Sequence, residues 1–158
     1  MDLSELPSIR TRVCGLLQEG NALLLLKHVG IGRAGYIWSP PGGGVGFDET
    51  VGEALQREFV EEVNLKVDVG EFLFVNDFRD ERFHAVELFF KVRRVKGSMQ
   101  LGHDPEMKGN EQILKEARYI RWPEIDEIPM DYKHNAFRFC ETPEEIMSLR
   151  GFHIFHDI

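Results

Sequence analysis

Residues 43–65 read GGVGFDETVGEALQREFVEEVNL, and this stretch carries the strongest structural signal in the sequence. Within it, apolar residues recur at every fourth position: Val51, Leu55, Phe59 and Val63. That spacing places them along one side of an α-helix. Asp48 or Thr50 can cap the start of the helix, and Asn64 can end it in a left-handed conformation. The stretch therefore predicts a helix over residues 50–63.

Three glutamates, Glu58, Glu61 and Glu62, occupy positions i, i+3 and i+4 of this helix. At ~100° per residue, their side chains fall within an arc of about 100° beside the apolar stripe. Like charges at this spacing repel by roughly 0.2–0.5 kcal/mol per exposed pair. Divalent cations bound by oxygen ligands offset such repulsion, and Mg2+ is the natural candidate. The alternative is an acidic helix face that is simply solvated.

The neighbours of the three glutamates favour a binding site over a solvated face. The run Pro41-Gly42-Gly43-Gly44 gives a backbone that can approach a ligand closely. Arg57 can make a two-pronged ion pair with Glu49 and tie the loop before the helix to the helix itself. A plain surface charge at Arg57 is the competing interpretation.

The stretch resembles the Nudix box, G-x5-E-x7-R-E-U-x-E-E-x-G-U, in which U is a bulky apolar residue. Asn64 stands where the family has glycine, and Asn is the residue next best suited to a left-handed helix end. Asp48 replaces a glycine that often precedes the first glutamate, and Pro40-Pro41-Gly42-Gly43 stands where Leu-Pro-Gly-Gly is frequent. The matching positions are Gly43, Glu49, Arg57, Glu58, Phe59, Glu61, Glu62 and Leu65.

The resemblance implies a role for each matching residue. Glu58, Glu61 and Glu62 are expected to bind Mg2+ or Mn2+, with the Gly43 carbonyl as a further ligand. Glu49 and Arg57 are expected to orient the site. Glu58 or a loop carboxylate is expected to activate the attacking water, and the loop candidates are Asp104, Glu106 and Glu111. A solvated loop is the alternative for these three acids.

Aromatic and basic residues near the box are candidates for substrate contact. Tyr36 and Trp38 could stack on a nucleobase, and Arg33, Arg79 or Arg82 could hold a phosphate. Core packing is the competing interpretation for the aromatic residues, and surface solvation for the arginines. Four more aromatic residues follow the box with the same two alternatives: Phe72, Phe74, Phe78 and Phe83.

The remaining pattern favours an α+β fold, in which helices pack on a mixed β-sheet as an α/β/α sandwich. Strands are expected over residues 10–18, 22–29, 72–75, 83–95 and 117–122, with only a short apolar segment at 36–38. The Pro-Gly run at 40–44 is expected to be neither helix nor regular strand interior. We expect a helical turn over 123–128, followed by one or two helices over 134–140 and 143–149. We expect residues 1–158 to form one domain, with a C-terminal helical segment and tail at about 131–158.

Composition excludes several classes of protein. The chain has 158 residues, 42% of them hydrophobic, which argues against disorder. A net charge of −8 without a long basic cluster argues against binding to a nucleic acid polymer. No apolar run is long enough to span a membrane, and the N-terminus does not resemble a signal peptide. Cys14 and Cys140 are expected to be reduced thiols in a soluble cytoplasmic protein.

The resemblance predicts hydrolysis of a nucleoside diphosphate linked to another moiety, a small-molecule substrate. One alternative is a non-catalytic module that senses a nucleotide or ADP-ribose on the same fold, but such chains usually lose box glutamates. Isopentenyl diphosphate isomerisation ranks lower, because neither cysteine lies near the box. In the family, a proline beyond the box indicates ADP-ribose and a tyrosine indicates diadenosine polyphosphates; residues 76–83 contain neither. Phe152 and Ile154 could form an edge strand or a homodimer contact, although a loosely packed terminus is the simpler expectation.

Overall fold

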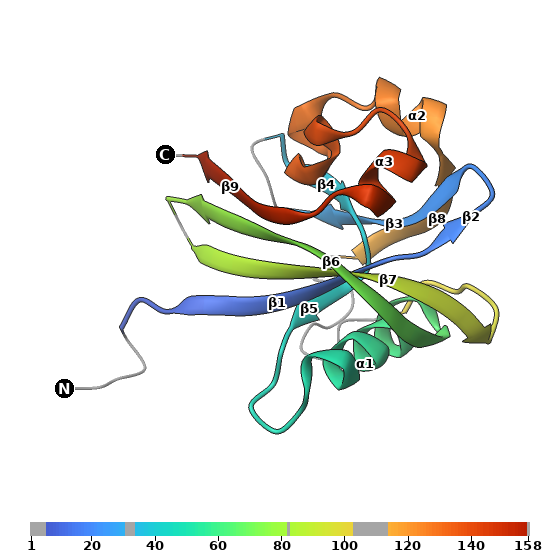
Figure 1. The fold of residues 1–158 in the computed structure, drawn as a ribbon, viewed down its shortest axis with the longest axis horizontal. Coiled ribbons are helices and arrows are strands. Elements are labelled where there is room, and N and C mark those ends of the chain that lie inside the picture. Colours follow the sequence, from blue (N-terminus) through green and yellow to red (C-terminus); the bar gives the residue numbers. More distant parts are fainter. Residues whose placement is uncertain (1–5, 31–33, 82, 103–113, 158) are drawn as a thin grey trace.

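The computed structural model describes residues 6–30, 34–81, 83–102 and 114–157, which form two β-sheets flanked by short helices (Figure 1). Within these residues the larger sheet has the order β5-β1-β7-β6-β9, and the smaller contains β2, β3, β4 and β8. The strands are β1 (Ile9–Leu16), β2 (Gln18–Glu19), β3 (Ala22–Val29), β4 (Tyr36–Ser39), β5 (Gly42–Gly44), β6 (Lys66–Asp80), β7 (His84–Lys96), β8 (Leu114–Arg121) and β9 (Gly151–Asp157). The helices are α1 (Val51–Val63), α2 (Trp122–Glu127) and α3 (Pro143–Ser148), with 3-10 turns η3 (Met130–Tyr132) and η4 (Asn135–Phe139).

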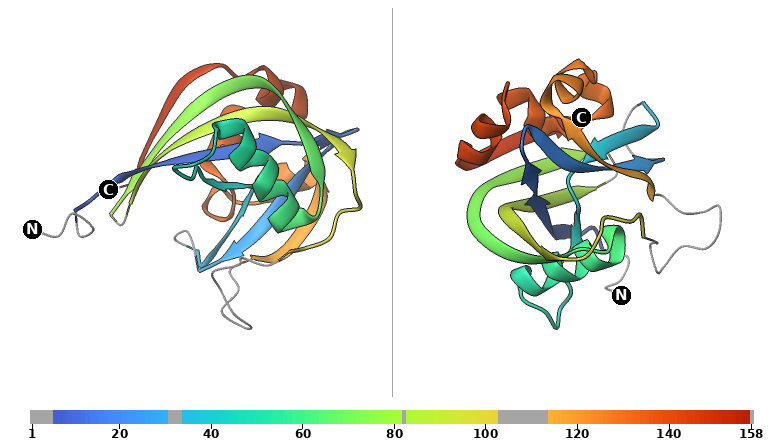
Figure 2. Two further views of the ribbon diagram at one scale, coloured as in Figure 1. Left: turned by 90° about the horizontal axis from the view of Figure 1, so that it is seen from below. Right: turned by 90° about the vertical axis from the view of Figure 1, so that its right-hand side faces the viewer.

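The larger sheet is mixed, as the sequence predicted. β1 runs parallel to β7, and β6 runs parallel to β9, whereas β1–β5 and β6–β7 are antiparallel. α1 lies on one side of the strands, and α2 and α3 lie on the other (Figure 1, Figure 2). The α+β class with a mixed sheet is therefore confirmed, and the chain adds a second, smaller sheet around β3.

Strand β3 explains the only long leucine run in the chain. Leu23, Leu24, Leu25 and Leu26 are each no more than 1% exposed. Leu23 and Leu25 pack into the apolar cluster that includes α2 and α3, whereas Leu24 and Leu26 pack into the cluster that includes α1. Because a strand directs alternate side chains to opposite faces, a strand buried on both sides has no polar alternation.

Helix α1 begins and ends where the sequence predicted. The Thr50 hydroxyl accepts a hydrogen bond from the Glu53 N–H, and the Glu53 carboxylate accepts one from the Thr50 N–H. This reciprocal pair is a capping box, which satisfies two N–H groups that the helix leaves unpaired. At the other end Asn64 has φ 59°, the left-handed conformation expected of it. Leu55, Phe59 and Val63 form the buried stripe.

The Pro-Gly run at 40–44 was expected to be neither helix nor regular strand interior, but its three glycines form a short strand. Gly42–Gly44 forms β5, which pairs with β1 at the edge of the larger sheet. An edge strand tolerates glycine because only one side is paired. A methyl group on Gly42 would lie 2.0 Å from the Val13 carbonyl oxygen. The close approach of β5 to β1 therefore requires glycine at this position.

Several other elements differ from their predicted bounds. β6 extends over 66–80, well beyond both ends of the predicted 72–75, because long-range pairing with β7 lengthens a strand that local patterns define poorly. β7 at 84–96 agrees with the predicted 83–95 within one residue at each end. Residues 135–139 form a 3-10 helix. The C-terminal segment is strand β9, paired with β6, and not a loose terminus. None of the helices in the described ranges is long and apolar enough to cross a membrane.

The capping box of α1 gives a stability prediction. Thr50→Ala removes the side-chain acceptor for the Glu53 N–H, and we expect it to lower the free energy of unfolding by about 1 kcal/mol. Thr50→Ser keeps the hydroxyl and serves as the control. Urea denaturation followed by circular dichroism measures the difference. An alanine variant with the wild-type midpoint would show that the cap contributes nothing.

Candidate active site

Helix α1 and strand β5 meet closely, and two glutamates of the helix contact glycines of the strand. Glu62 is 6% exposed, and its Oε1 accepts a hydrogen bond of 2.9 Å from the Gly42 N–H. Glu58 lies against Gly43, where an added methyl group would be 2.3 Å from Glu58 Oε1. The absence of side chains on β5 therefore makes room for both carboxylates.

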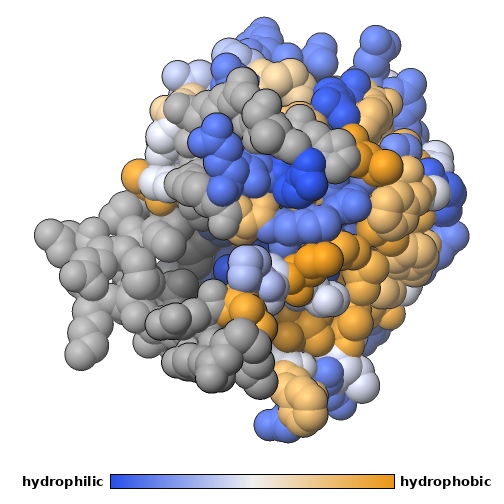
Figure 3. Space-filling model, turned by 90° about the vertical axis from the view of Figure 1, so that its left-hand side faces the viewer, coloured by the Kyte–Doolittle hydropathy of each residue, from blue (hydrophilic) through white to orange (hydrophobic). Residues whose placement is uncertain are grey.

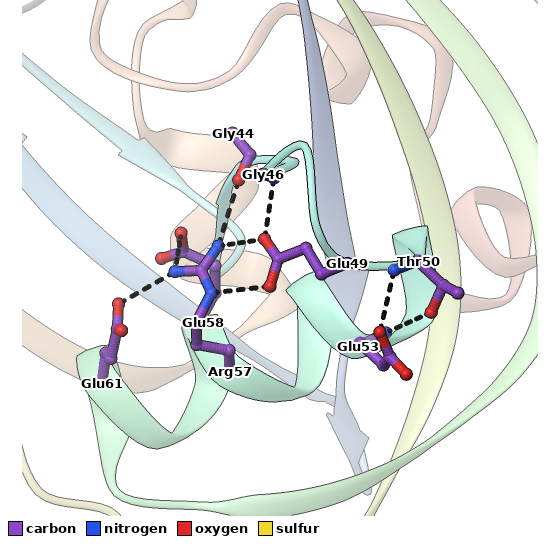
Figure 4. A network of polar contacts seen from close by, with 8 residues as sticks. All are labelled: Gly44, Gly46, Glu49, Thr50, Glu53, Arg57, Glu58 and Glu61. Carbon is purple, nitrogen blue, oxygen red and sulfur yellow. Dashed lines mark hydrogen bonds and ion pairs between the residues drawn. The ribbon is translucent and has the colours of Figure 1, made fainter.

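Arg57 forms the two-pronged ion pair with Glu49 that the sequence indicated (Figure 4). Its Nε donates to Glu49 Oε2 at 3.0 Å, and its Nη2 donates to Glu49 Oε1 at 2.7 Å. The Gly46 N–H donates to the same Oε1 at 2.8 Å. Because a paired guanidinium and carboxylate fix both distance and orientation, the loop before α1 is tied to the helix.

The same guanidinium also contacts two of the clustered carboxylates. Arg57 Nη1 donates to Glu58 Oε1 at 3.0 Å and to Glu61 Oε2 at 3.2 Å, and Nη2 donates to the Gly44 carbonyl at 3.2 Å. Figure 4 shows these side chains converging from the loop and one edge of the helix. One cation thus offsets part of the repulsion among the negative side chains and sets their positions.

The carboxylates differ in how readily they ionise. Burial raises the pKa of Glu58, and the charge of Glu61 adds to this rise, while Arg57 opposes it. Burial likewise raises the pKa of Glu62 well above its usual value, with a further contribution from Glu58. The hydrogen bond from Arg57 is the main cause that lowers the pKa of Glu49 to about 2. Glu49 is therefore firmly ionised, whereas Glu58 and Glu62 resist ionisation without an additional cation.

The backbone of β5 decides which glycine carbonyl faces the carboxylates. The Gly15 N–H donates to the Pro41 carbonyl and the Val45 N–H donates to the Thr11 carbonyl. Because hydrogen-bonded pairs alternate in an antiparallel ladder, Gly43, opposite Val13, directs its carbonyl at β1. The N–H of Gly42 and the carbonyl of Gly44 instead reach α1. The geometry thus corrects the expectation for Gly43 and favours the Gly42 carbonyl as a ligand.

The donor set suits a hard divalent cation, although the ligands have not converged. Among the described residues, no three His, Cys, Asp or Glu side chains already surround one point. Arg57 holds one oxygen each of Glu58 and Glu61, and the Gly42 N–H holds one oxygen of Glu62. Carboxylate and carbonyl oxygens are the ligands that Mg2+ prefers.

The other predicted residues lie in varied places. Trp38 is 8% exposed within the apolar core, so its ring is enclosed and the expected stacking role is not supported. Tyr36 is half-buried, with its ring 4.6 Å from that of Tyr132. Arg79 is exposed on β6. Phe74 is buried and stacks on Phe89, as the core interpretation expected. Five candidates lie outside the described residues: Arg33, Arg82, Asp104, Glu106 and Glu111.

A second polar cluster escaped the sequence interpretation. Glu87 on β7 is 8% exposed, and its carboxylate contacts Asn76 on β6, His134 before η4 and Arg12 on β1. The signal was present in the strand pattern, because Glu87 occupies the core-facing position between Ala85 and Phe89. A glutamate in phase with buried apolar residues needs buried partners.

Comparisons with known proteins agree with this fold. A family model described as NUDIX domain matches residues 7–142. The ADP-ribose pyrophosphatase of Methanocaldococcus jannaschii is 31% identical, over 70% of this chain and 72% of that protein. A NUDIX hydrolase structure from Nitrosomonas europaea has a TM-score of 0.66 at 20% identity, covering 93% of this chain and 78% of that one. An ADP-ribose pyrophosphatase structure from Streptococcus suis has a TM-score of 0.61 at 15% identity, covering 91% and 98%.

The raised pKa of Glu62 predicts that this side chain destabilises the metal-free protein. When the pKa of a carboxyl is higher in the folded state than in the unfolded state, the protein loses stability as the pH rises above the unfolded-state pKa. The loss persists at neutral pH. Glu62→Gln keeps an acceptor for the Gly42 N–H and removes the charge. We therefore expect its melting temperature in EDTA at pH 7 to exceed that of wild type by a few degrees.

The control is Glu127→Gln, which removes an exposed carboxylate at the end of α2. Differential scanning calorimetry at pH 7 and again at pH 4 measures the effect, and the gain should shrink at the lower pH. A Glu62→Gln protein that melts below wild type at pH 7 would contradict the electrostatic account.

Proposed function

The chain belongs to the Nudix hydrolase family, and on that premise we propose that it hydrolyses a phosphoanhydride bond in a nucleoside diphosphate linked to another moiety. The family and the ADP-ribose pyrophosphatase relative make it a Nudix pyrophosphohydrolase. One observation carries the finer proposal. Glu58, Glu61 and Glu62 line one edge of α1, and Glu58 and Glu62 contact the glycines of β5.

Nudix hydrolases generally use divalent metals, and we propose Mg2+ or Mn2+ for this one. Glu58, Glu61 and Glu62 would hold it, with the Gly42 carbonyl as a backbone ligand. When bound, the metal would neutralise charge on the phosphoryl oxygens and make water more acidic. Arg57, held by Glu49, keeps Glu58 and Glu61 oriented toward this position.

The proposed base is Glu58. Its Oε1 accepts from Arg57, whereas its Oε2 makes no hydrogen bond to any residue in the described ranges. Burial raises the pKa of Glu58 above its usual value, which makes the carboxylate a stronger proton acceptor at neutral pH. Glu58 Oε2 could therefore take a proton from an attacking water. Glu106 and Glu111, outside the described residues, stay predictions for this role.

Two observations bear on the substrate. The Methanocaldococcus jannaschii relative is an ADP-ribose pyrophosphatase, which favours ADP-ribose here. Residues 76–83 contain neither the proline nor the tyrosine that marks ADP-ribose or diadenosine polyphosphates in the family. Nucleoside triphosphates and nucleotide sugars therefore belong in the same test. All box glutamates are present, which favours hydrolysis over a sensing module. Tyr36 and Arg79 stay predictions for substrate contact.

The remaining proposals concern the whole chain. We propose that residues 1–158 act as one Nudix domain in the cytoplasm. A homodimer through the edge strand β9 is supported by Phe152 and Ile154, which are 60% and 51% exposed. Figure 3 shows a broad hydrophobic area on the face it draws, bordered by hydrophilic residues. An exposed edge strand that carries apolar side chains is a common place for chains to pair.

A substrate panel tests the proposed function. The purified protein is incubated with ADP-ribose, nucleotide sugars, nucleoside triphosphates and dinucleoside polyphosphates, with Mg2+, with Mn2+ and with EDTA. We expect metal-dependent turnover of at least one of these classes, with products that identify the cleaved anhydride. The absence of turnover across the panel with both metals would reject the proposal.

Variants of the box connect this turnover to the carboxylates. Glu61→Gln combined with Glu62→Gln should stay folded and lose turnover by at least about a hundredfold, because two proposed metal ligands lose their charge. The matched control is Glu81→Gln with Glu127→Gln, which removes two exposed charges away from α1. Undiminished Mg2+-dependent activity in the Glu61/Glu62 variant would refute the assignment.

A further inference from the structure

Arg12 lies between the box and the buried polar cluster around Glu87. On β1 it is opposite Gly44 of β5 on one side and opposite Glu87 of β7 on the other. Val13 packs toward α1 and Cys14 packs into the other cluster, so Arg12, two residues before Cys14, shares the face of Cys14 and Glu87. Its Nε is 3.8 Å from Glu87 Oε2, and its side chain is 29% exposed.

The charge of Arg12 reaches the proposed metal ligands. Burial raises the pKa of both Glu58 and Glu62, and in each case Arg12 is among the charges that oppose the rise. Burial and the Arg12 charge together lower the pKa of His28, on β3, to about 4. The guanidinium is therefore near groups of both sheets. A second guanidinium of β1 lies beside the same glycine, because a methyl group on Gly44 would be 3.7 Å from Arg10 Nη2.

The donors of Arg12 make no hydrogen bond to any residue that the structure describes, in contrast to those of Arg57. Within the described part of the chain, the Arg12 guanidinium makes no hydrogen bond, because its ion pair with Glu87 spans 3.8 Å. Arg57, by comparison, donates to Glu49, Glu58, Glu61 and the Gly44 carbonyl. A guanidinium carries five N–H donors in a planar fork that matches phosphate oxygens. Arg12 thus offers an anion-binding group beside a site that otherwise repels anions.

Glu87 is built to hold that guanidinium in place. Its Oε1 accepts from Asn76 Nδ2 at 3.0 Å and pairs with His134 Nε2 at 2.8 Å. His134 Nδ1 accepts from the Ala136 N–H, so the Nε2 carries the proton that it donates to Glu87. Asn76 in turn exchanges two hydrogen bonds with Asn135. Every partner fixes Oε1 and leaves Oε2 directed at Arg12 and the Cys14 thiol.

The carboxylate of Glu87 also stays charged. Burial alone would raise its pKa, but His134, Arg12 and the Asn76 hydrogen bond outweigh burial and lower it. A fixed negative charge at this position restrains Arg12 by attraction without occupying its donors. A retained charge and a fixed position next to Arg12 distinguish Glu87 from a side chain that only fills the core.

We propose that Arg12 binds the diphosphate group of the substrate, on the side opposite the box carboxylates, and that Glu87 is the positioning residue that holds Arg12 there. The proposal rests on the proposed function and adds a residue outside the box to it. A diphosphate bound there would have its negative oxygens between a cation held by α1 and the Arg12 guanidinium on β1. The cation and the guanidinium would then attract the negative diphosphate, which the net negative charge of the protein would otherwise repel.

The test compares Arg12→Gln and Arg12→Lys with wild type on the substrate that the panel identifies. Charged hydrogen bonds contribute roughly 1.5–3 kcal/mol, or about tenfold to hundredfold in affinity. We therefore expect Arg12→Gln to raise KM, and the inhibition constant of inorganic pyrophosphate, by at least about tenfold in a protein that keeps the wild-type circular dichroism spectrum. Arg12→Lys should recover part of the loss, because it keeps the charge without the planar fork.

Arg93→Gln is the matched control, since it removes one positive charge from an exposed position on β7, where Arg93 pairs with Asp68. Glu87→Gln should raise KM less than Arg12→Gln does, because the guanidinium keeps its charge and donors and loses only the carboxylate that restrains it. Should Glu87→Gln fail to fold, the Arg12 variants decide alone. KM and pyrophosphate inhibition of Arg12→Gln within about twofold of wild type would overturn the proposal.

A calorimetric titration of ADP in the presence of Mg2+ separates this inference from the proposed function. If the wild-type protein binds ADP but turns over no panel substrate, the proposed hydrolysis is rejected. A weaker affinity of Arg12→Gln for ADP would still support the contact between Arg12 and the diphosphate. Equal dissociation constants for the two proteins would reject the contact even in an active enzyme.

Discussion

The candidate site depends on keeping three negative side chains close together on one edge of a helix. Glu58, Glu61 and Glu62 repel one another, and two of them are buried enough for their pKa values to rise. Arg57 offsets part of this repulsion, and its ion pair with Glu49 fixes it in position. The glycines of β5 remove the side chains that would otherwise fill the same space. The capped helix α1, the loop joined to it by the Glu49–Arg57 pair and the glycine strand β5 thus all hold the three glutamates close together.

Local features of this arrangement could be predicted from the sequence. The apolar stripe, the Thr50 cap and the left-handed Asn64 depend on residues within a few positions of one another, so their pattern is visible in one stretch of chain. The pair of Arg57 and Glu49 was equally visible, because a helix and the loop before it have few conformations. The family resemblance likewise rested on residues of this one stretch, among them Glu49, Arg57 and Phe59.

Features that depend on pairing between distant segments could not be predicted. The strand character of Gly42–Gly44 comes from β1. Only the phase of that ladder shows that the polar backbone groups of Gly42 point away from β1, whereas those of Gly43 point at it. β9 joins the sheet through β6, about 75 residues earlier in the chain. Glu87 and Arg12 drew no attention in isolation, since each is an ordinary charged residue until the fold brings β1, β6, β7 and η4 together.

The central claim is that divalent cations bridged to a diphosphate are what make the crowded carboxylates tolerable. The most direct measurement is a crystal structure of the protein grown with Mn2+ and a non-hydrolysable nucleotide analogue, with anomalous scattering used to locate the metal. The account predicts anomalous density at about 2.1 Å from oxygens of Glu58, Glu61 and Glu62 and from phosphate oxygens of the analogue. Well-ordered carboxylates turned toward solvent, with neither metal nor analogue density beside them, would contradict it.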